Sequence, residues 1–252
     1  MTDTFSIKGQ IESSPALKSG TIDYDHHWTL NRGGILNIYG NLEYDDIARI
    51  TGHPNPIKLI QFARQFQVNE QTLQLLNEKV FYNDKSTRFR ETFNGYGAFN
   101  DLQFLKYLSN LKYFGFGAFH KIDLSPIRDY VELSDFGIGG YNIPLKPIEG
   151  YKHLTSFGFG DKIRDTKIIS TFCNLENLGI SSQNLKGLDF VFALEKLKSI
   201  SFSFGGTTAF EDLTQLKKLE ELDIWRTKKL EIEHLIPING IKNLKVLKLR
   251  EL

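Results

Sequence analysis

The chain has 252 residues, and 31 Lys and Arg against 30 Asp and Glu leave it a formal net charge of +1. That balance argues against an electrostatic clamp on nucleic acid, which needs a basic surface. A hydrophobic share of 40% and a charged share of 24% are ordinary for a globular protein and exclude wholesale disorder. The unusual feature is the pairing of 20 Phe with 21 Gly, which suggests many short strands.

The N-terminal residues 1–8 contain no apolar core and no small-residue cleavage site, so we expect no secretion signal. Runs of about 18 apolar residues are absent from the sequence, so we expect no membrane span. These absences favour a cytoplasmic protein. The single cysteine, Cys173, follows an apolar stretch, and we expect a buried thiol with neither a disulfide nor a zinc partner.

The first third of the chain, residues 1–87, shows local helix and strand signals. We expect short strands near residues 34–39 and a helical turn over 45–50, before a Gly- and Pro-rich breaker at 52–56. After the breaker an amphipathic helix is predicted from Ile57, Ile60, Phe62, Ala63 and Phe66. Asn69 should cap a second helix that carries Leu73, Leu75, Leu76 and Val80. This second helix has too few cations for a DNA-binding helix-turn-helix.

From Leu111 onward an apolar–x–x–apolar–x–apolar frame recurs, with starts separated by 22, 21, 21, 22, 22 and 25 residues. Seven copies in frame are not a chance pattern. An eighth, weaker copy precedes them, with its strand near residues 90–96. The seven sets are Leu111/Phe114/Phe116, Leu133/Phe136/Ile138, Leu154/Phe157/Phe159, Leu175/Leu178/Ile180, Leu197/Ile200/Phe202, Leu219/Leu222/Ile224 and Leu244/Leu247/Leu249.

Each copy resembles a leucine-rich repeat of the short class, about 22 residues long, that occurs in internalins and other bacterial repeat proteins. The resemblance implies an α/β solenoid, an arc with a parallel β-sheet on its concave face. We expect about seven to eight repeats over residues 88–252, and an irregular α+β cap over residues 1–87. The second half of each repeat should return as a tight 3₁₀-like or extended segment.

One departure from the family is systematic. Leucine-rich repeats usually carry Asn or Cys just after the strand, where the side chain satisfies backbone groups of the turn. Here these positions hold other residues, so the turns must be satisfied in another way. They are Phe119, Tyr141, Lys162, Gln183, Gly205 and Thr227.

The resemblance also implies that the strand positions that do not face the core point to the concave side, where most family members bind protein partners. Two columns of these positions are almost bare and become large and charged near the C-terminus. The residues that we expect to contact a partner are Tyr113, Gly115, Asp135, Gly137, Ser156, Gly158, Asn177, Gly179, Ser201, Glu221, Asp223, Trp225 and Arg226.

Three explanations of the bare columns stay open. Glycine within a strand costs about 0.5–1 kcal/mol relative to alanine, so stacked glycines need a reason. They could relieve crowding in a curved sheet, or form a smooth trough for a partner's helix or loop. In the third explanation, the N-terminal third folds back and fills the trough itself.

Catalytic motifs are absent from the sequence. The Gly-x-Gly strings lie within strands and alternate with core aromatics, unlike a dinucleotide fingerprint, so we expect no cofactor and no metal. The leading hypothesis is a non-enzymatic protein-interaction module that binds a protein partner on its concave face. Its narrower form is a protein that neutralises a toxin or effector, as an immunity protein does. The alternative is an enzyme or enzyme regulator with a site at Asp23, Asp25, His26 and His27.

The last predicted strand, residues 244–249, carries nothing in sequence that would cap the final layer of core. An open sheet edge promotes association unless something covers it. We therefore expect either a homodimer through this end or a partner that shields it.

Overall fold

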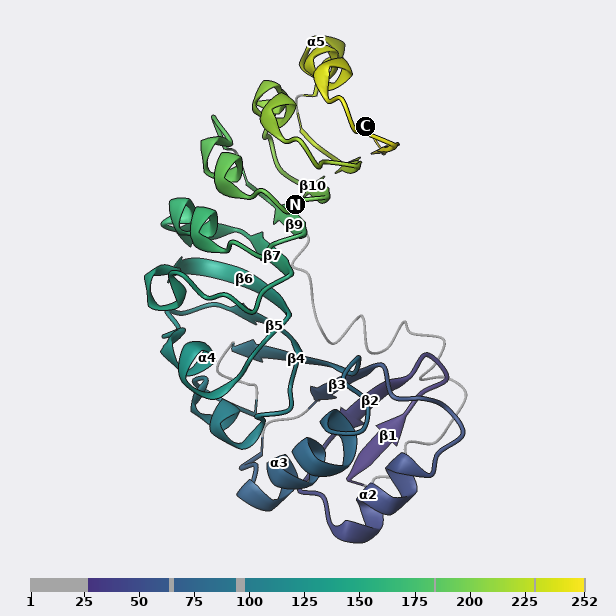
Figure 1. Cartoon of the computed structure of the whole chain (residues 1–252). Helices are drawn as coiled ribbons and strands as arrows, with labels where there is room; N and C mark the ends of the chain where they lie inside the picture. The colour runs from purple at the N-terminus through teal and green to yellow at the C-terminus, as the bar shows by residue number, and fades with distance from the viewer. Residues whose placement is uncertain (1–26, 64–65, 94–97, 184, 229, 252) are drawn as a thin grey trace, which may run out of the picture.

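The computed structural model describes residues 27–63, 66–93, 98–183, 185–228 and 230–251. The chain forms an arc, with the strands along its inner side and the return segments along its outer side (Figure 1). Within the described residues a 12-stranded sheet has the order β1-β2-β3-β4-β5-β6-β7-β9-β10-β11-β12, and β8 pairs with β6. This open, largely parallel sheet confirms the solenoid that the repeat predicts.

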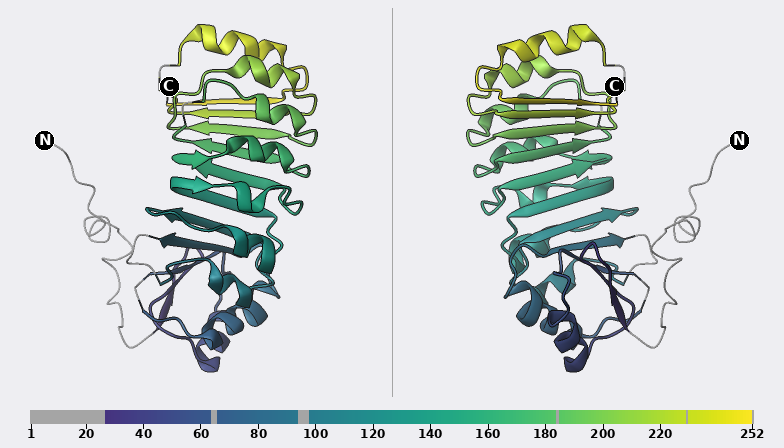
Figure 2. Two further views of the ribbon diagram at one scale, coloured as in Figure 1. Left: turned by 90° about the vertical axis from the view of Figure 1, so that its left-hand side faces the viewer. Right: turned by 90° about the vertical axis from the view of Figure 1, so that its right-hand side faces the viewer.

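The strands stack one above another along the arc (Figure 2). Every pairing between neighbours is parallel except that of β1 with β2, which is antiparallel. The strands are β1 (Trp28–Leu30), β2 (Ile35–Ile38), β3 (Leu59–Phe62), β4 (Arg88–Phe93), β5 (Tyr113–Ala118), β6 (Asp135–Pro144), β7 (Ser156–Gly160), β8 (Lys162–Arg164), β9 (Asn177–Ser181), β10 (Ser199–Ser203), β11 (Glu221–Trp225) and β12 (Val246–Arg250).

The return segments are mostly short 3₁₀ turns, as the sequence predicts. They are η3 (Gln103–Tyr107), η4 (Lys146–Ile148), η5 (Thr166–Thr171), η6 (Asp189–Ala193), η7 (Phe210–Gln215) and η8 (Ile236–Gly240). The helical elements are α2 (Tyr44–Thr51), α3 (Glu70–Leu76), the π-helical turn η2 (Asn77–Phe81), α4 (Ser125–Tyr130) and α5 (Ile232–Leu235). The longer helices lie in the N-terminal third, where the segments between strands are longest.

The N-terminal third contributes strands to the same sheet. β2 pairs in parallel with β3, and β3 in parallel with β4, so the sheet crosses residue 87 without a break. β1 is the edge strand at this end. The expected helix at 45–50 and strand near 34–39 are confirmed as α2 and β2. Asn69 caps α3 by accepting a hydrogen bond from the Thr72 backbone N–H at 2.9 Å.

The amphipathic helix predicted after Pro56 is wrong, because this stretch forms strand β3. Ile60 and Phe62 alternate with half-buried neighbours, and this period of two fits a strand as well as the helical spacing does. The choice is made by non-local pairing: β3 lies between β2 and β4 and hydrogen-bonds to both. The sequence pattern alone does not contain that information.

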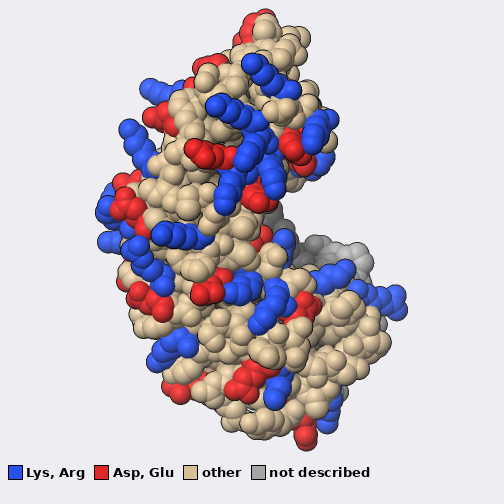
Figure 3. Space-filling model, viewed as in Figure 1, with Lys and Arg blue, Asp and Glu red and all other residues tan. Residues whose placement is uncertain are grey.

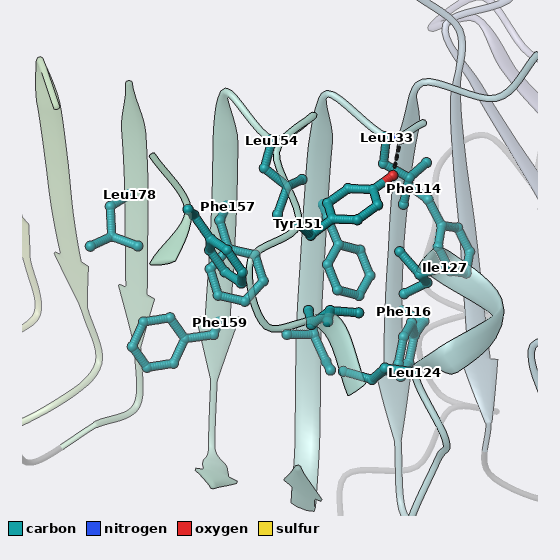
Figure 4. Packing of buried hydrophobic residues seen from close by; sticks show 14 of the residues in the cluster. Phe114, Phe116, Leu124, Ile127, Leu133, Tyr151, Leu154, Phe157, Phe159 and Leu178 are labelled. Carbon is teal, nitrogen blue, oxygen red and sulfur yellow. Dashed lines mark hydrogen bonds between the residues drawn. The ribbon is translucent and has the colours of Figure 1, made fainter. Parts of the chain in front are cut away.

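Phenylalanine fills the core at positions where the family frame usually has leucine. Phe89, Phe114, Phe136 and Phe157 occupy equivalent positions of successive strands, with ring centroids 5.6, 6.2 and 5.8 Å apart. Each of these rings is at most 2% exposed. Figure 4 shows two members of this column, Phe114 and Phe157, in the core together with Leu124 and Ile127 of the return segment that follows β5. The buried Tyr151 hydroxyl accepts a hydrogen bond from the Leu133 N–H at 2.7 Å and donates one to the Val131 carbonyl at 2.6 Å.

The turns after the strands are satisfied by the backbone rather than by an asparagine ladder. The residue that follows the strand takes a positive φ in several repeats: Asp161, Ser182, Phe204, Arg226 and Glu251. Its N–H then donates to the strand end of the next repeat, as from Ser182 to Ser203 at 2.8 Å and from Phe204 to Trp225 at 3.1 Å. Gly205 is needed at one turn, because a Cβ there would lie 2.2 Å from the Gln183 carbonyl oxygen.

Cys173 is exposed, which contradicts the expectation of a buried thiol. The buried side chains around it are Ile169, Phe172 and Leu175, spaced by three residues along the end of η5. This three-residue spacing turns Cys173 outward, although its neighbours in sequence are apolar. No described helix is long and apolar enough to span a bilayer.

Candidate functional site

Strand alternation places the predicted contact residues of β5 to β11 on one face, whereas Arg226 follows β11 and takes a positive φ. In β5 to β11 the buried positions point into the core and the intervening ones point to the inner side of the arc. Parallel pairing then aligns Gly115, Gly137, Gly158 and Gly179 as one column and continues it through Ser201 and Asp223. A second column contains Gly117, Gly139 and Gly160, then Ser181, Ser203 and Trp225. The register confirms both columns; their role in binding stays a prediction.

We call the surface formed by these seven glycines the glycine floor. A Cβ built on Gly117 or Gly158 has no heavy atom within 4 Å, and one on Gly137 approaches nothing closer than 3.8 Å. The tightest contact on the floor is 3.4 Å, from Gly160 to the Ser181 side chain. None of the seven has a positive φ. Backbone strain and crowding of a single methyl group therefore do not explain why these positions lack side chains.

A hollow of about 750 Å³ lies over β4 to β6, and we call it the β4 hollow. Its floor includes Gly115 and Gly137, and its charged rim consists of Lys58, Arg88, Arg90 and Asp135. A shallower hollow of about 350 Å³ continues over the glycines and serines of β7 to β10. The volume of the larger hollow lies in the range of small-ligand and side-chain pockets.

Two arginines of β4 are held in place at this hollow. Arg90 donates from Nε to the Gln61 Oε1 atom at 3.2 Å, and its Nη2 donates to the same oxygen. Gln61 in turn donates to the Asn37 side chain at 2.7 Å. The Arg88 guanidinium lies over the Tyr113 ring, 5.8 Å from its centroid, and its Nη2 is 3.7 Å from Asp135 Oδ2.

Asp135 is the acidic group of the β4 hollow, and its side chain is 30% exposed. Burial raises the pKa of its carboxyl group, although Arg88 and a hydrogen bond with Ser156 act in the opposite direction. The net direction shows that these two partners do not fully compensate for the lost hydration. A hydrogen-bond donor placed beside Asp135 would therefore gain a favourable contact.

The opposite end of the floor carries aromatic and charged side chains. Trp225 packs on Phe204 with ring centroids 4.5 Å apart, and the Arg250 guanidinium lies 5.1 Å from the Trp225 centroid. Arg250 also donates from Nε to Asp223 at 3.0 Å, and Lys248 pairs with Glu221 at 2.5 Å. Arg226 pairs with Glu251. The cations at this end are thus neutralised by adjacent carboxylates, and both signs of charge intermingle over the face seen in Figure 3.

Arg88, Arg90 and Lys58 are not among the residues predicted from the sequence, because the repeat pattern places the first strand near Arg90 and the spacing after Pro56 predicts a helix at residue 58. The alternation of exposed and buried residues over 88–93 was the signal that could have placed both arginines on the inner face. Phe204, whose positive φ directs it toward Trp225, is not among the predicted residues either. Of the alternative site, Asp23, Asp25 and His26 lie outside the described residues.

His27, the remaining member of the alternative site, is described. Its Nδ1 atom lies 2.7 Å from the Asn41 carbonyl oxygen and 4.0 Å from Asp46 Oδ2. Among the residues that the structure describes, no group of three or more His, Cys, Asp or Glu side chains could hold a metal ion. His27 thus lies between the N-terminal end of the sheet and α2, and its side chain is 55% exposed.

Comparison with solved structures places the fold. An internalin, InlF of Listeria monocytogenes, superposes with a TM-score of 0.53 at 18% identity, covering 84% of this chain and 58% of its own. The chain therefore spans under two thirds of that protein. Internalin C2 of the same organism has a TM-score of 0.42 at 16% identity, covering 72% of this chain and 84% of its own. A complex of TLR13 with single-stranded RNA has a TM-score of 0.39 at 13% identity, covering 86% of this chain and 39% of its own.

The leucine-rich-repeat resemblance is thereby confirmed as a likeness of fold to internalins. A search of protein-family models found no match. A search of curated proteins found no match either.

Proposed function

We propose that the protein is a non-enzymatic interaction module that binds a protein partner on the inner face of its sheet, against the glycine floor. The carrying observation is that each floor glycine has space for a Cβ atom and carries none. Glycine costs stability in a strand, so its repetition where the fold does not need it supports a role in close approach by another molecule.

The floor favours a packed partner over a paired strand. Its central strands are hydrogen-bonded to neighbours on both sides, so they offer no free backbone groups for strand addition. The glycine floor together with the strands on either side of it, β4 and β10, covers five strand spacings, roughly 24 Å at about 4.8 Å per spacing. A partner helix of about 16 residues has this length.

The two ends of the floor supply contacts that would anchor such a partner. Tyr113 and Arg88 rise at the β4 end, and Trp225 with Arg226 at the β11 end. Trp, Tyr and Arg are the residue types that most often dominate binding energy at interfaces. A toxin- or effector-neutralising role is the narrower form of this proposal, and it requires that the partner be an enzyme or toxin whose activity falls on binding.

The proposal can be tested by substitutions that place side chains on the glycine floor. The variant Gly137→Gln/Gly158→Gln adds two side chains at positions where a Cβ atom would meet no heavy atom closer than 3.8 Å, so the fold should persist by circular dichroism. Affinity capture followed by quantitative mass spectrometry should retain a partner on the wild type and lose it on this variant. Lys167→Gln, on the outer segment η5, is the matched control and should keep the partner. If the Gly137→Gln/Gly158→Gln variant captures the partner as well as the wild type does, the partner does not bind on the glycine floor.

We also propose self-association through β12, one of the two alternatives that the sequence leaves for this end of the sheet. Val246, Leu247 and Leu249 are 41–45% exposed, although Leu247 and Leu249 continue columns that are buried in every preceding repeat. Within the described residues no strand pairs with the outer edge of β12. Exposed apolar side chains beside free backbone groups form a surface suited to a second copy.

A further inference from the structure

The two ends of the inner face differ in charge balance, and the difference indicates what the partner presents. At the C-terminal end Lys248, Arg250 and Arg226 each pair with a carboxylate. At the β4 end Lys58, Arg88 and Arg90 surround the hollow, and only Asp135 opposes them. The β4 hollow therefore carries an excess of two positive charges at its rim.

Arg90 forms no ion pair with a described carboxylate, and the same holds for Lys58, whereas Arg88 lies 3.7 Å from Asp135. The described contacts of Arg90 are to the uncharged Gln61, which Asn37 holds in turn. Glu91, the next residue, alternates to the buried face of β4 and is 3% exposed, so its carboxyl group does not belong to the rim. Among the described residues Arg90 is thus an oriented guanidinium with no carboxylate beside it, the arrangement that suits a carboxylate ligand.

The hollow suits a short acidic segment better than a polyanion. The glycine floor beyond the rim carries no cation over β5 to β9 on its two columns, so a nucleic-acid backbone would meet successive phosphates with no partner. Asp135 inside the hollow would also repel a second anion. One carboxylate at Arg90 and a hydrogen-bond donor at Asp135 satisfy both groups.

Building on the proposed function, we propose that the β4 hollow binds an acidic segment of the protein partner. An Asp or Glu carboxylate of that segment accepts hydrogen bonds from Arg90 and forms an ion pair with Lys58. A backbone or side-chain N–H of the segment donates a hydrogen bond to Asp135. The residues that follow the carboxylate lie on Gly115 and Gly137. The bound partner therefore has a defined orientation along the sheet: its acidic part lies over β4 to β6, and its neutral part lies over β7 to β10.

The test selects peptides from a random 12-residue phage library on the immobilised full chain. We expect the selected peptides to be enriched in Asp and Glu, and the dissociation constant of the best peptide, measured by fluorescence polarisation, to rise about tenfold in Arg90→Gln. The affinity should also fall as NaCl is raised. Lys245→Gln, whose surface ion pair with Glu220 lies away from the hollow, is the control and should bind as the wild type does.

Three outcomes would overturn the inference, and they separate it from the proposed function. In the first outcome, the selected peptides lose affinity for Gly137→Gln/Gly158→Gln, but they are not enriched in Asp and Glu or they bind Arg90→Gln as tightly as the wild type. This result would overturn the acidic site alone. Peptides that bind the Gly137→Gln/Gly158→Gln variant normally, or a library that yields no peptide, would contradict both. A dT12 oligonucleotide that binds through Arg90 where acidic peptides do not would assign the hollow to nucleic acid instead.

Discussion

Glu91 lies directly opposite Phe116 in the register of β4 and β5, at a position that the following strands fill with apolar residues. Its Oε1 atom accepts a hydrogen bond from the Thr92 backbone N–H at 2.8 Å, and Oε2 has no partner among the described residues. Burial raises the pKa of this carboxyl to about 7, although the Thr92 hydrogen bond acts in the opposite direction. The folded chain therefore favours the protonated, neutral form.

A pH dependence of stability follows from this buried carboxyl. Below pH 4.5 the carboxyl is protonated in both states, and between 4.5 and about 7 only the folded state holds the proton. The free energy of unfolding therefore falls as the pH rises through this window, by about 3 kcal/mol in total. Glu91→Gln keeps the acceptor and removes the titration, so it should match the wild type near pH 4.5 and be more stable near pH 8.

Urea denaturation at a series of pH values measures this difference. Glu195→Gln, at an exposed position, is the control and should change the profile little. A wild-type profile as flat as that of Glu91→Gln would show that the carboxyl of Glu91 is ionised in the folded chain.

The glycine floor predicts an unusual gain in stability. Gly117→Ala and Gly158→Ala place a methyl group where no heavy atom lies within 4 Å. Each should raise the free energy of unfolding by about 0.5–1 kcal/mol, because alanine reduces the freedom of the unfolded chain. Gly205→Ala should be destabilising, since its Cβ would lie 2.2 Å from the Gln183 carbonyl oxygen. Thermal melts of the three variants measure both directions, and losses at Gly117 and Gly158 would restore the crowding explanation.

The phenylalanine column carries much of the core packing. Phe136 is fully buried between Phe114 and Phe157, so Phe136→Ala should lose about 3–5 kcal/mol of stability. Phe136→Leu should lose less, because leucine occupies the equivalent position of β9 and β11. Phe119, 77% exposed, is the control, and Phe119→Ala should stay within about 0.5 kcal/mol in urea denaturation. Equal losses at the two sites would contradict the role of this column.

The open edge predicts concentration-dependent association. Leu247→Lys/Leu249→Lys should abolish it, because charged side chains at an exposed edge strand oppose pairing with a second copy. Sedimentation equilibrium of the wild type and the variant over a range of concentrations is the measurement. Amide exchange in β12 should slow as the wild-type concentration rises. A wild type that remains monomeric, with fast exchange in β12 throughout, would exclude the homodimer.

Much of the fold was readable because its signal is local and repeated. Apolar residues at every second position, such as Phe114 and Phe116, specify a strand and its buried face. Their recurrence after about 22 residues specifies the stacking, since each repeat contacts chiefly its neighbours. The glycine columns were visible for the same reason. Cys173 and the segment at 57–66 were predicted wrongly, because similar apolar patterns fit more than one local structure.

The sequence by itself thus determined the repeat, the register of the strands from β5 onward and the bareness of the inner face. Tertiary structure decided the rest: that β3 is a strand, that Arg90 stands beside the glycine floor with no described carboxylate in salt-bridge distance, and that a Cβ on any floor glycine would meet nothing closer than 3.4 Å. The physical reason is separation along the chain. Asn37, Gln61 and Arg90 meet only because three parallel strands align them, and no spacing within one repeat encodes that meeting.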